Sequence, residues 1–179
     1  MEMAMTDARQ GSQLKWLWLG LLVLVLDLGA KAIATSVLTY ASPVPVLPFF
    51  NFTLLHNTGA AFSFLAGAAG WQRWFFVVLA LVVSVILVFW LRSLKRNETW
   101  LAIALVLILG GALGNVYDRI VHGYVVDFLH FYWNDWHFPA FNIADSAITI
   151  GAGMMILDMF RKPSDSPEGS GDKNREKPQ

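Results

Sequence analysis

Four runs of apolar residues divide the chain, and polar or proline-rich segments separate them. The runs are Lys15–Ala34, Trp74–Leu91, Trp100–Tyr117 and Phe141–Phe160. A helix of about 20 residues, rising about 1.5 Å per residue, crosses the hydrocarbon core of a bilayer, which is about 30 Å thick. The pattern therefore predicts four transmembrane helices in a single membrane domain that spans residues 15–160.

The segment between the first two runs does not have a helical pattern. Pro43, Pro45 and Pro48 interrupt any helix there. The residues Phe50–Leu54 alternate between apolar and polar, which is typical of a half-buried strand. The following Ala60–Ala69 stretch is small and apolar, and it predicts a short helix at the membrane interface. The fold class predicted is a mainly α membrane protein with a strand-containing outer segment.

Composition supports a membrane protein and excludes several functions. Hydrophobic residues make up 56% of the chain, charged residues make up 15%, and the mean hydropathy is +0.51, which is too apolar for an ordinary soluble domain. The formal net charge is zero, so we expect no nucleic-acid partner. The absence of cysteine excludes disulfides and a thiol nucleophile. The histidines are scattered without metal-ligand spacing, so we predict no metal site; they are His56, His122, His130 and His137.

Lysine and arginine are concentrated near one set of helix ends, and cytoplasmic loops carry such an excess. The sequence therefore places a polar N-terminal segment, residues 1–14, and a disordered tail, residues 161–179, in the cytoplasm. The basic residues concerned are Arg9, Lys15, Arg92, Lys95, Arg96, Arg161 and Lys162. The other side carries tryptophans that fit an outer aromatic belt, namely Trp71, Trp74, Trp133 and Trp136.

A cleaved signal peptide is the competing interpretation of the first run. Arg9 and Lys15 precede the run, and Ala30–Ala32 resembles a cleavage site. The run is long for a signal peptide, however, and three further apolar runs follow it. We therefore expect the first run to be a retained helix.

Two aspartates carry the candidate chemistry, because ionisable groups at the edge of a membrane are costly and usually mark a functional site. Asp127 follows the third run, and Asp145 opens the fourth. Two carboxyl groups close together in a poorly hydrated place share one proton. Such a pair can activate water and protonate a leaving amine without a metal or a covalent intermediate. This is the chemistry of an aspartic peptidase.

The two aspartates also fit roles that involve no peptidase chemistry. Each can be a helix cap or a solvated residue. The pair can also be a proton relay in a small transporter or channel subunit, although transporters usually place such acids near the midplane and contain internal repeats. A Ser–Lys dyad using Lys31 with Ser63 or Ser146 is a further possibility, but neither serine has a nucleophile-elbow sequence.

Several polar residues near the aspartates are predicted to support the site. Asp27 and Lys31 are four residues apart, so they share a helix face and are expected to form a structural ion pair. Asp118 and Arg119 are interpreted as a positioning pair at the end of the third span. Gly59 permits a tight turn beside Asn57, and Asn115 and Asn142 flank the acids; the predicted site thus gathers Asp27, Lys31, Asn57, Gly59, Asn115, Asp118, Arg119, Asp127, Asn142 and Asp145.

Four short motifs, in order, resemble those of the lipoprotein signal peptidases, also called signal peptidase II. They are DLGAK at residues 27–31, NTGAAF at 57–62, GNVYDR at 114–119 followed by VVDF at 125–128, and FNIAD at 141–145. Each motif alone is weak, but the four together on a four-span frame are specific, and they cover about residues 15–160. The first motif departs from the family pattern at Ala30, where the family often has serine or threonine.

The resemblance implies a bacterial inner-membrane aspartic endopeptidase with its site on the extracytoplasmic face. Such enzymes remove the signal peptide of a prolipoprotein just before a cysteine that carries diacylglycerol. By the family pattern Asp127 and Asp145 are catalytic, and the substrate site includes Asn57, Gly59, Asn115, Arg119 and Asn142. The resemblance also implies a small extracytoplasmic β-cradle with an interfacial helix. We expect a monomer without a cofactor, whose partners are membrane lipid and lipid-modified prolipoproteins.

Overall fold

The computed structural model describes residues 13–59 and 70–161. Three predictions lie wholly or mostly outside these residues: the polar N-terminal segment over residues 1–14, the interfacial helix over 60–69, and the disordered tail over 161–179. Within the described residues, long apolar helices and one small antiparallel sheet form the structure, which confirms the predicted fold class.

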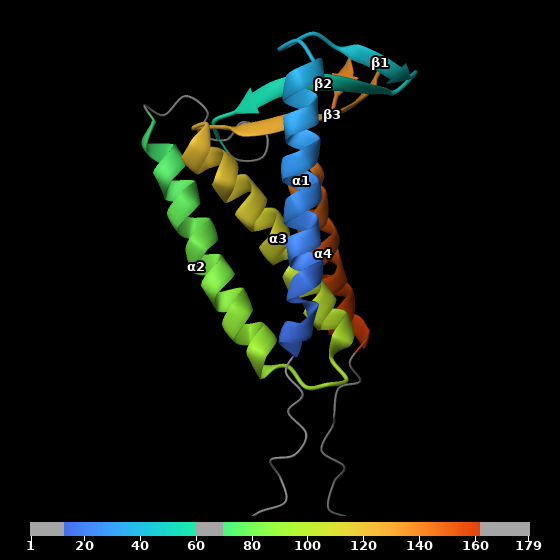
Figure 1. Cartoon of the computed structure of the whole chain (residues 1–179). Coiled ribbons are helices and arrows are strands. Elements are labelled where there is room, and N and C mark those ends of the chain that lie inside the picture. Colours follow the sequence, from blue (N-terminus) through green and yellow to red (C-terminus); the bar gives the residue numbers. More distant parts are fainter. Residues whose placement is uncertain (1–12, 60–69, 162–179) are drawn as a thin grey trace, which may run out of the picture.

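Four helices of the described chain are long and apolar enough to cross a membrane. They are α1 (Leu17–Val37), α2 (Trp71–Ser93), α3 (Thr99–Val121) and α4 (Ile143–Arg161), and the 3₁₀ turn η1 (Gln13–Trp16) precedes α1. Helix α3 packs against each of the other three, so it is the centre of the bundle. Both described chain ends lie at the same end of the bundle as the α2–α3 connection (Figure 1).

Burial separates the central helix from the peripheral ones. In the most apolar 18-residue stretch of each helix, 67% is buried in α3, 28% in the first helix and 22% in α2. Helix α1 buries one stripe at a spacing of three or four residues, and its members are Gly20, Val23, Asp27, Lys31 and Ala34. The opposite face of α1 is apolar and exposed, as at Leu21, so it suits contact with lipid.

A four-stranded antiparallel sheet lies across the other end of the bundle (Figure 1). Its strands are β1 (Val44–Leu47), β2 (Phe50–Asn57), β3 (Val125–Trp133) and β4 (Trp136–His137), in the spatial order β1-β2-β3-β4. The predicted strand over 50–54 is therefore present and longer than expected. The β2–β3 pairing joins segments about seventy residues apart in sequence. The C-terminal ends of α1 and α3 lie at this sheet.

Strand β2 buries two polar side chains as well as Leu54. Asn51 and Thr53 are buried, whereas Phe50 and Phe52 are only half-buried. The aromatic rings instead pack on each other and on Phe131 of β3, with the centroids of Phe50 and Phe131 4.8 Å apart. Alternation alone correctly indicates a strand, but it does not say which side chains are buried; here Thr53 is buried with its Oγ1 3.2 Å from Nδ1 of His130.

Helix α3 runs four residues beyond its predicted end at Tyr117. Asp118 and Arg119 are therefore helical, and the polar residues do not end the helix because they have partners inside the bundle. Gly123 ends it instead, with a φ of 88° and its N–H directed at the carbonyls of Asp118 and Arg119. A residue with a side chain rarely adopts this conformation, so glycine allows the chain to turn directly into β3.

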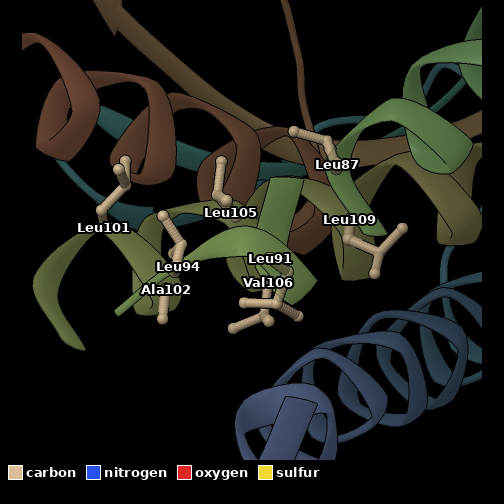
Figure 2. Packing of buried hydrophobic residues seen from close by; sticks show 8 residues of the cluster. All are labelled: Leu87, Leu91, Leu94, Leu101, Ala102, Leu105, Val106 and Leu109. Carbon is tan, nitrogen blue, oxygen red and sulfur yellow. The ribbon is translucent and has the colours of Figure 1, made fainter. Parts of the chain in front are cut away.

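The bundle end opposite the sheet is held by apolar packing. Eight buried side chains from the end of α2 and the start of α3 meet there, which we call the apolar cluster (Figure 2): Leu87, Leu91, Leu94, Leu101, Ala102, Leu105, Val106 and Leu109. Gln13 closes this end, because its side-chain Nε2 donates to the carbonyls of Lys95 and Arg96 at 2.8 and 2.9 Å.

Candidate active site

A cavity of about 860 Å³ opens between the sheet and the helices, and both candidate aspartates line it. Its polar walls come from β2, α3, β3 and α4: Asn57, Asn115, Arg119, Asp127, Asp145 and Ser146. Apolar walls come mainly from the segment before α4 and from α4 itself, including Phe138, Phe141 and Ile148. Tyr40 and Asp145, which are 105 positions apart in the chain, thus face one space.

Asp145 is placed by a reciprocal cap at the start of α4. The Oδ1 of Asn142 accepts from the backbone N–H of Asp145 at 2.9 Å, and the backbone N–H of Asn142 donates to Oδ2 of Asp145 at 3.3 Å. This is the geometry of a capping box, which satisfies N–H groups that a helix start leaves free. The cap explains why α4 begins at Ile143 rather than at the predicted Phe141.

Asp127 is placed by the sheet. It lies opposite Leu55 in the β2–β3 register and is 3% exposed. Its Oδ1 accepts from Nδ2 of Asn142 at 2.8 Å, and Asn57 also donates to its carboxyl group. Burial, followed by the negative charge of Asp145, raises the pKa of Asp127 to about 7. Asp127 can therefore hold a proton at neutral pH.

Asn115 connects Asp145 to the interior of the bundle. Its Nδ2 donates to Oδ1 of Asp145 at 2.8 Å. Its Oδ1 accepts from Lys31 at 3.1 Å and from Nδ2 of Asn142 at 3.3 Å. The two asparagines therefore present their NH₂ groups to the two carboxyl groups, Asn115 to Asp145 and Asn142 to Asp127.

Lys31 lies beneath the aspartates in a buried ion cluster. Its Nζ is 2.7 Å from Oδ2 of Asp27, which is the predicted ion pair, and 2.9 Å from Oδ2 of Asp118. Asp27 also accepts from the N–H of Ala144, and Asp118 from the N–H of Val126. The cluster and the candidate pair form the carboxylate network: Asp27, Lys31, Asn115, Asp118, Asp127, Asn142 and Asp145.

Arg119 holds the end of β2 rather than its neighbour in sequence. Its NH2 group donates to the carbonyl of Gly59 at 2.8 Å, and its guanidinium lies over the ring of Phe76. Gly59 in turn donates its N–H to Oδ1 of Asn57 at 3.0 Å, which is the predicted turn. Asp118 and Arg119 have separate partners, because adjacent helical residues point in different directions. Their role as a pair that positions the end of the third span stays a prediction.

The Ser–Lys interpretation does not fit the surroundings of Lys31. Nζ of Lys31 lies 2.7 and 2.9 Å from the carboxylates of Asp27 and Asp118 and donates to Oδ1 of Asn115, so its partners are acceptors other than a serine hydroxyl. Ser146 donates its hydroxyl to the carbonyl of Asn142 at 2.9 Å. Ser63 lies outside the described residues. Lys31 is therefore held as a cation among acceptors and not as a base beside a serine.

Two of the four histidines lie side by side in the sheet. Nδ1 of His137 lies 3.2 Å from Nε2 of His130, and their rings stack. His56 stacks on Tyr124, with ring centroids 3.9 Å apart. Burial lowers the pKa of His56 and of His130, each aided by the neighbouring histidine. In the part of the chain that the structure describes, no three His, Cys, Asp or Glu side chains are placed to hold a metal ion.

Membrane-length helices, a small sheet across one end and acidic side chains in one cavity define a class of membrane enzyme. A family model described as signal peptidase (SPase) II matches residues 19–161, and the chain belongs to this family. It is therefore a membrane protease, and aspartic chemistry is characteristic of the family.

Relatives and solved structures agree with this family. A lipoprotein signal peptidase of Pseudomonas putida is 60% identical over 158 residues, which cover 87% of this chain and 92% of the relative. One from Pseudomonas aeruginosa strain PAO1 is 58% identical over 88% of this chain and 94% of its own length. A bacterial membrane enzyme solved in meso at 2.3 Å resolution is 30% identical, with a TM-score of 0.76 over 88% of this chain and 94% of that one. The predicted resemblance is thereby confirmed, and the protease is favoured over the transporter.

Proposed function

We propose that Asp127 and Asp145 are the catalytic pair of a peptidase that removes signal peptides from lipid-modified prolipoproteins. The observation that carries the proposal is their convergence in one cavity, each facing an asparagine NH₂ group. An aspartic mechanism needs one charged and one protonated carboxyl group. The burial of Asp127 and its pKa of about 7 support its assignment as the protonated member.

The two carboxyl groups take different roles. We assign Asp145 as the charged member, because both of its oxygens have donors: Oδ1 accepts from Nδ2 of Asn115 and Oδ2 from the backbone N–H of Asn142. Charged Asp145 takes a proton from water as the oxygen attacks the scissile carbonyl, and Asp127 gives its proton to the carbonyl oxygen. When the C–N bond breaks, Asp145 passes its proton to the leaving nitrogen, and Asp127 regains one from a hydroxyl of the intermediate.

Arg119, Asn57 and Gly59 orient the peptide in this proposal. Arg119 and Asn57 line the cavity beside the carboxyl groups, and Arg119 fixes Gly59 through the bond to its carbonyl. These polar groups at the wall of the cavity hold the peptide in an extended form, so that its scissile carbonyl meets the attacking water.

The substrate is a precursor that carries diacylglycerol on the cysteine after the cleaved bond. The apolar walls of the cavity, at Phe138, Phe141, Ile148 and Ile150, suit a substrate held by its own helix and by acyl chains. Each CH₂ group buried contributes about 0.8 kcal/mol, so acyl chains can supply much of the affinity. The polar groups then select the position of the bond. Relatives in Pseudomonas carry the name lipoprotein signal peptidase.

The sheet end of the bundle faces the extracytoplasmic side in this proposal. The described chain ends and the α2–α3 connection share the opposite end (Figure 1). The connection contains Lys95 and Arg96, and basic residues favour the cytoplasm. At the sheet end Trp71, Trp133 and Trp136 are more than half exposed, as in an interfacial belt.

The test is cleavage of a lipidated and an unlipidated precursor of the same sequence by purified enzyme in one detergent. We expect the lipidated precursor to be cut far faster, and cleavage to vanish in Asp127→Asn and in Asp145→Asn. Asp135→Asn is the matched control, because Asp135 is exposed on the turn before β4. Equal rates on the two precursors contradict the lipid-anchored substrate, and an active Asp145→Asn enzyme contradicts the catalytic pair.

A further inference from the structure

Lys31 has one neutral acceptor among its three partners. Two of its contacts are with the carboxylates of Asp27 and Asp118, and the third is with Oδ1 of Asn115 at 3.1 Å. Lys31 is only 3% exposed, so no water layer replaces any of them. One carboxylate already balances the ammonium charge, so the contact with Asn115 is not explained by charge neutralisation.

The contact with Lys31 decides which way the Asn115 amide faces. An amide side chain accepts at one end and donates at the other, and a half-turn exchanges the ends. An ammonium group only donates, so it admits only the orientation with Oδ1 toward it. Nδ2 of Asn142 donates to the same oxygen at 3.3 Å and favours the same orientation. The NH₂ group of Asn115 is thereby directed to Asp145.

The reversed amide has two repulsive contacts. Its NH₂ group would face the Lys31 ammonium, and its oxygen would face the carboxyl group of Asp145. In a buried site such contacts are more costly than in water, because the effective dielectric constant is lower. Asn142 needs no such help, since the backbone N–H of Asp145 already fixes its oxygen at 2.9 Å.

We propose that Lys31 is a positioning residue of the peptidase: it orients Asn115 so that the amide of Asn115 holds Asp145 for reaction. This inference rests on the proposed function, because it assigns Lys31 an effect on a proposed catalytic group that it does not touch. If the role of Lys31 were only structural, its ion pairs with Asp27 and Asp118 would join α1 to α3 and have no other effect. Both roles predict lower thermal stability without Lys31, but they differ in how Lys31 and Asn115 combine in turnover.

The test is a double-mutant cycle on kcat for a lipidated precursor, expressed per folded enzyme. Misplacing a reacting group costs roughly 10²-fold, and we expect losses of this order in Lys31→Met and in Asn115→Ala. Because Lys31 acts through Asn115, adding Lys31→Met to Asn115→Ala causes no further loss. Losses that multiply, or a Lys31→Met enzyme with normal kcat, overturn the proposal.

A charge-balanced variant covers the case in which Lys31→Met does not fold. Asp27→Asn/Lys31→Met/Asp118→Asn removes the unpaired charges and keeps oxygens for the N–H groups of Ala144 and Val126. The proposal predicts the same low kcat for this variant, and normal kcat overturns it. Leu105→Ala is the control for lost stability alone, because Leu105 lies ten positions before Asn115, about 15 Å along α3.

The same assay separates this inference from the proposed function. Asp145→Asn is measured beside the Lys31 variants. An active Asp145→Asn enzyme overturns the catalytic pair, and with it the role given to Lys31. An inactive Asp145→Asn enzyme together with a fully active Lys31→Met enzyme overturns only the positioning role.

Discussion

The two ends of helix α3 bury their side chains in different ways. At one end Leu101, Leu105 and Leu109 join the apolar cluster, which is held by shape and by removal from water or lipid (Figure 2). At the other end Asn115 and Asp118 join the carboxylate network, which is held by directional hydrogen bonds and ion pairs. One helix thus serves both as a packing element and as a frame for charged groups.

The difference between the ends indicates what each is for. Burying charges costs free energy that their attraction often does not recover, so an apolar replacement of the same shape can be equally stable. A contribution to stability therefore does not explain why the carboxylate network is present. Its distinguishing feature is the orientation of its two asparagine side chains, each of which directs its NH₂ group to one aspartate. The comparison predicts that variants in the apolar cluster change stability and that variants in the network change turnover.

The largest effect on stability is expected in the apolar cluster. Leu105→Ala removes a side chain that is 1% exposed, and such a change costs about 2–5 kcal/mol of unfolding free energy. Thermal unfolding in detergent measures the loss, and kcat per folded enzyme should be unchanged. Leu21→Ala is the matched control, because Leu21 is 61% exposed on the outer face of α1. Equal losses in both variants would contradict the role of the cluster.

A smaller effect on stability, with a loss of turnover, is expected where α3 meets Asp27. A Cβ added at Gly114 would lie 2.5 Å from Oδ2 of Asp27, so Gly114→Ala displaces that carboxylate. Overpacking of this kind costs about 1–3 kcal/mol. Asp27 contacts Lys31 and the start of α4, so kcat should fall as well.

Gly29→Ala is the matched control for this substitution. A Cβ at Gly29 meets no heavy atom within 4 Å, so the same change of residue type carries no steric effect there. Thermal unfolding and precursor cleavage measure both variants. A Gly114→Ala enzyme with normal stability and turnover would show that the close contact with Asp27 is unimportant.

The pH dependence of turnover follows from Asp127. The pKa of Asp127 is raised to about 7, first by burial and then by the charge of Asp145. The proposed mechanism uses its protonated form. We therefore expect kcat/KM to fall above pH 7 by about tenfold per unit, because each unit removes nine-tenths of the remaining protonated form. The measurement is a cleavage profile from pH 6 to 9, with enzyme unfolding monitored in parallel. A rate that keeps rising to pH 9 would be inconsistent with Asp127 as the acid.

Asp127 also makes the stability of the protein depend on pH. Because the folded pKa of Asp127 lies above the usual value of 3.8, the folded protein binds the proton more tightly than the unfolded chain. The stabilisation that comes from this tighter proton binding is present at low pH and is lost as pH rises toward 7. Asp127→Asn cannot ionise, so we expect it to gain stability relative to the parent between pH 5 and pH 8. Parallel melting curves at both pH values test this, and an identical pH dependence in both proteins would contradict it.

The sequence predicts the membrane helices well because their signal is local and long. Each apolar run is long enough to cross a bilayer, and each coincides with a helix. The site residues stand out for a related reason: Asn115, Asp127 and Asp145 interrupt or border apolar runs, where a polar group is costly. The structure brings these residues to one cavity, while their catalytic and binding roles remain predictions.

The sheet and the caps are less predictable. Pairing of β2 with β3 places Leu55 opposite Asp127, 72 positions away in the chain. No local sequence pattern predicts such a contact. The sequence predicts the end of α3 too early, at Tyr117. Asp118 can lie inside the helix because its carboxylate has a buried partner in Lys31. The capping box of Asn142 and Asp145 does have a local signal, a cap residue followed three positions later by an acid, and it could have been recognised.

We propose that Asp127 and Asp145 act on the substrate as one unit. The most direct measurement is the rate at which a lipidated precursor loses its signal peptide with Asp127→Asn, Asp145→Asn and the double variant. Each single variant should be slower by at least about 10²–10⁴-fold, and the double variant should be no slower than the slower single one. Near-normal turnover in either single variant, or a double variant that shows the product of the two losses, would contradict the claim.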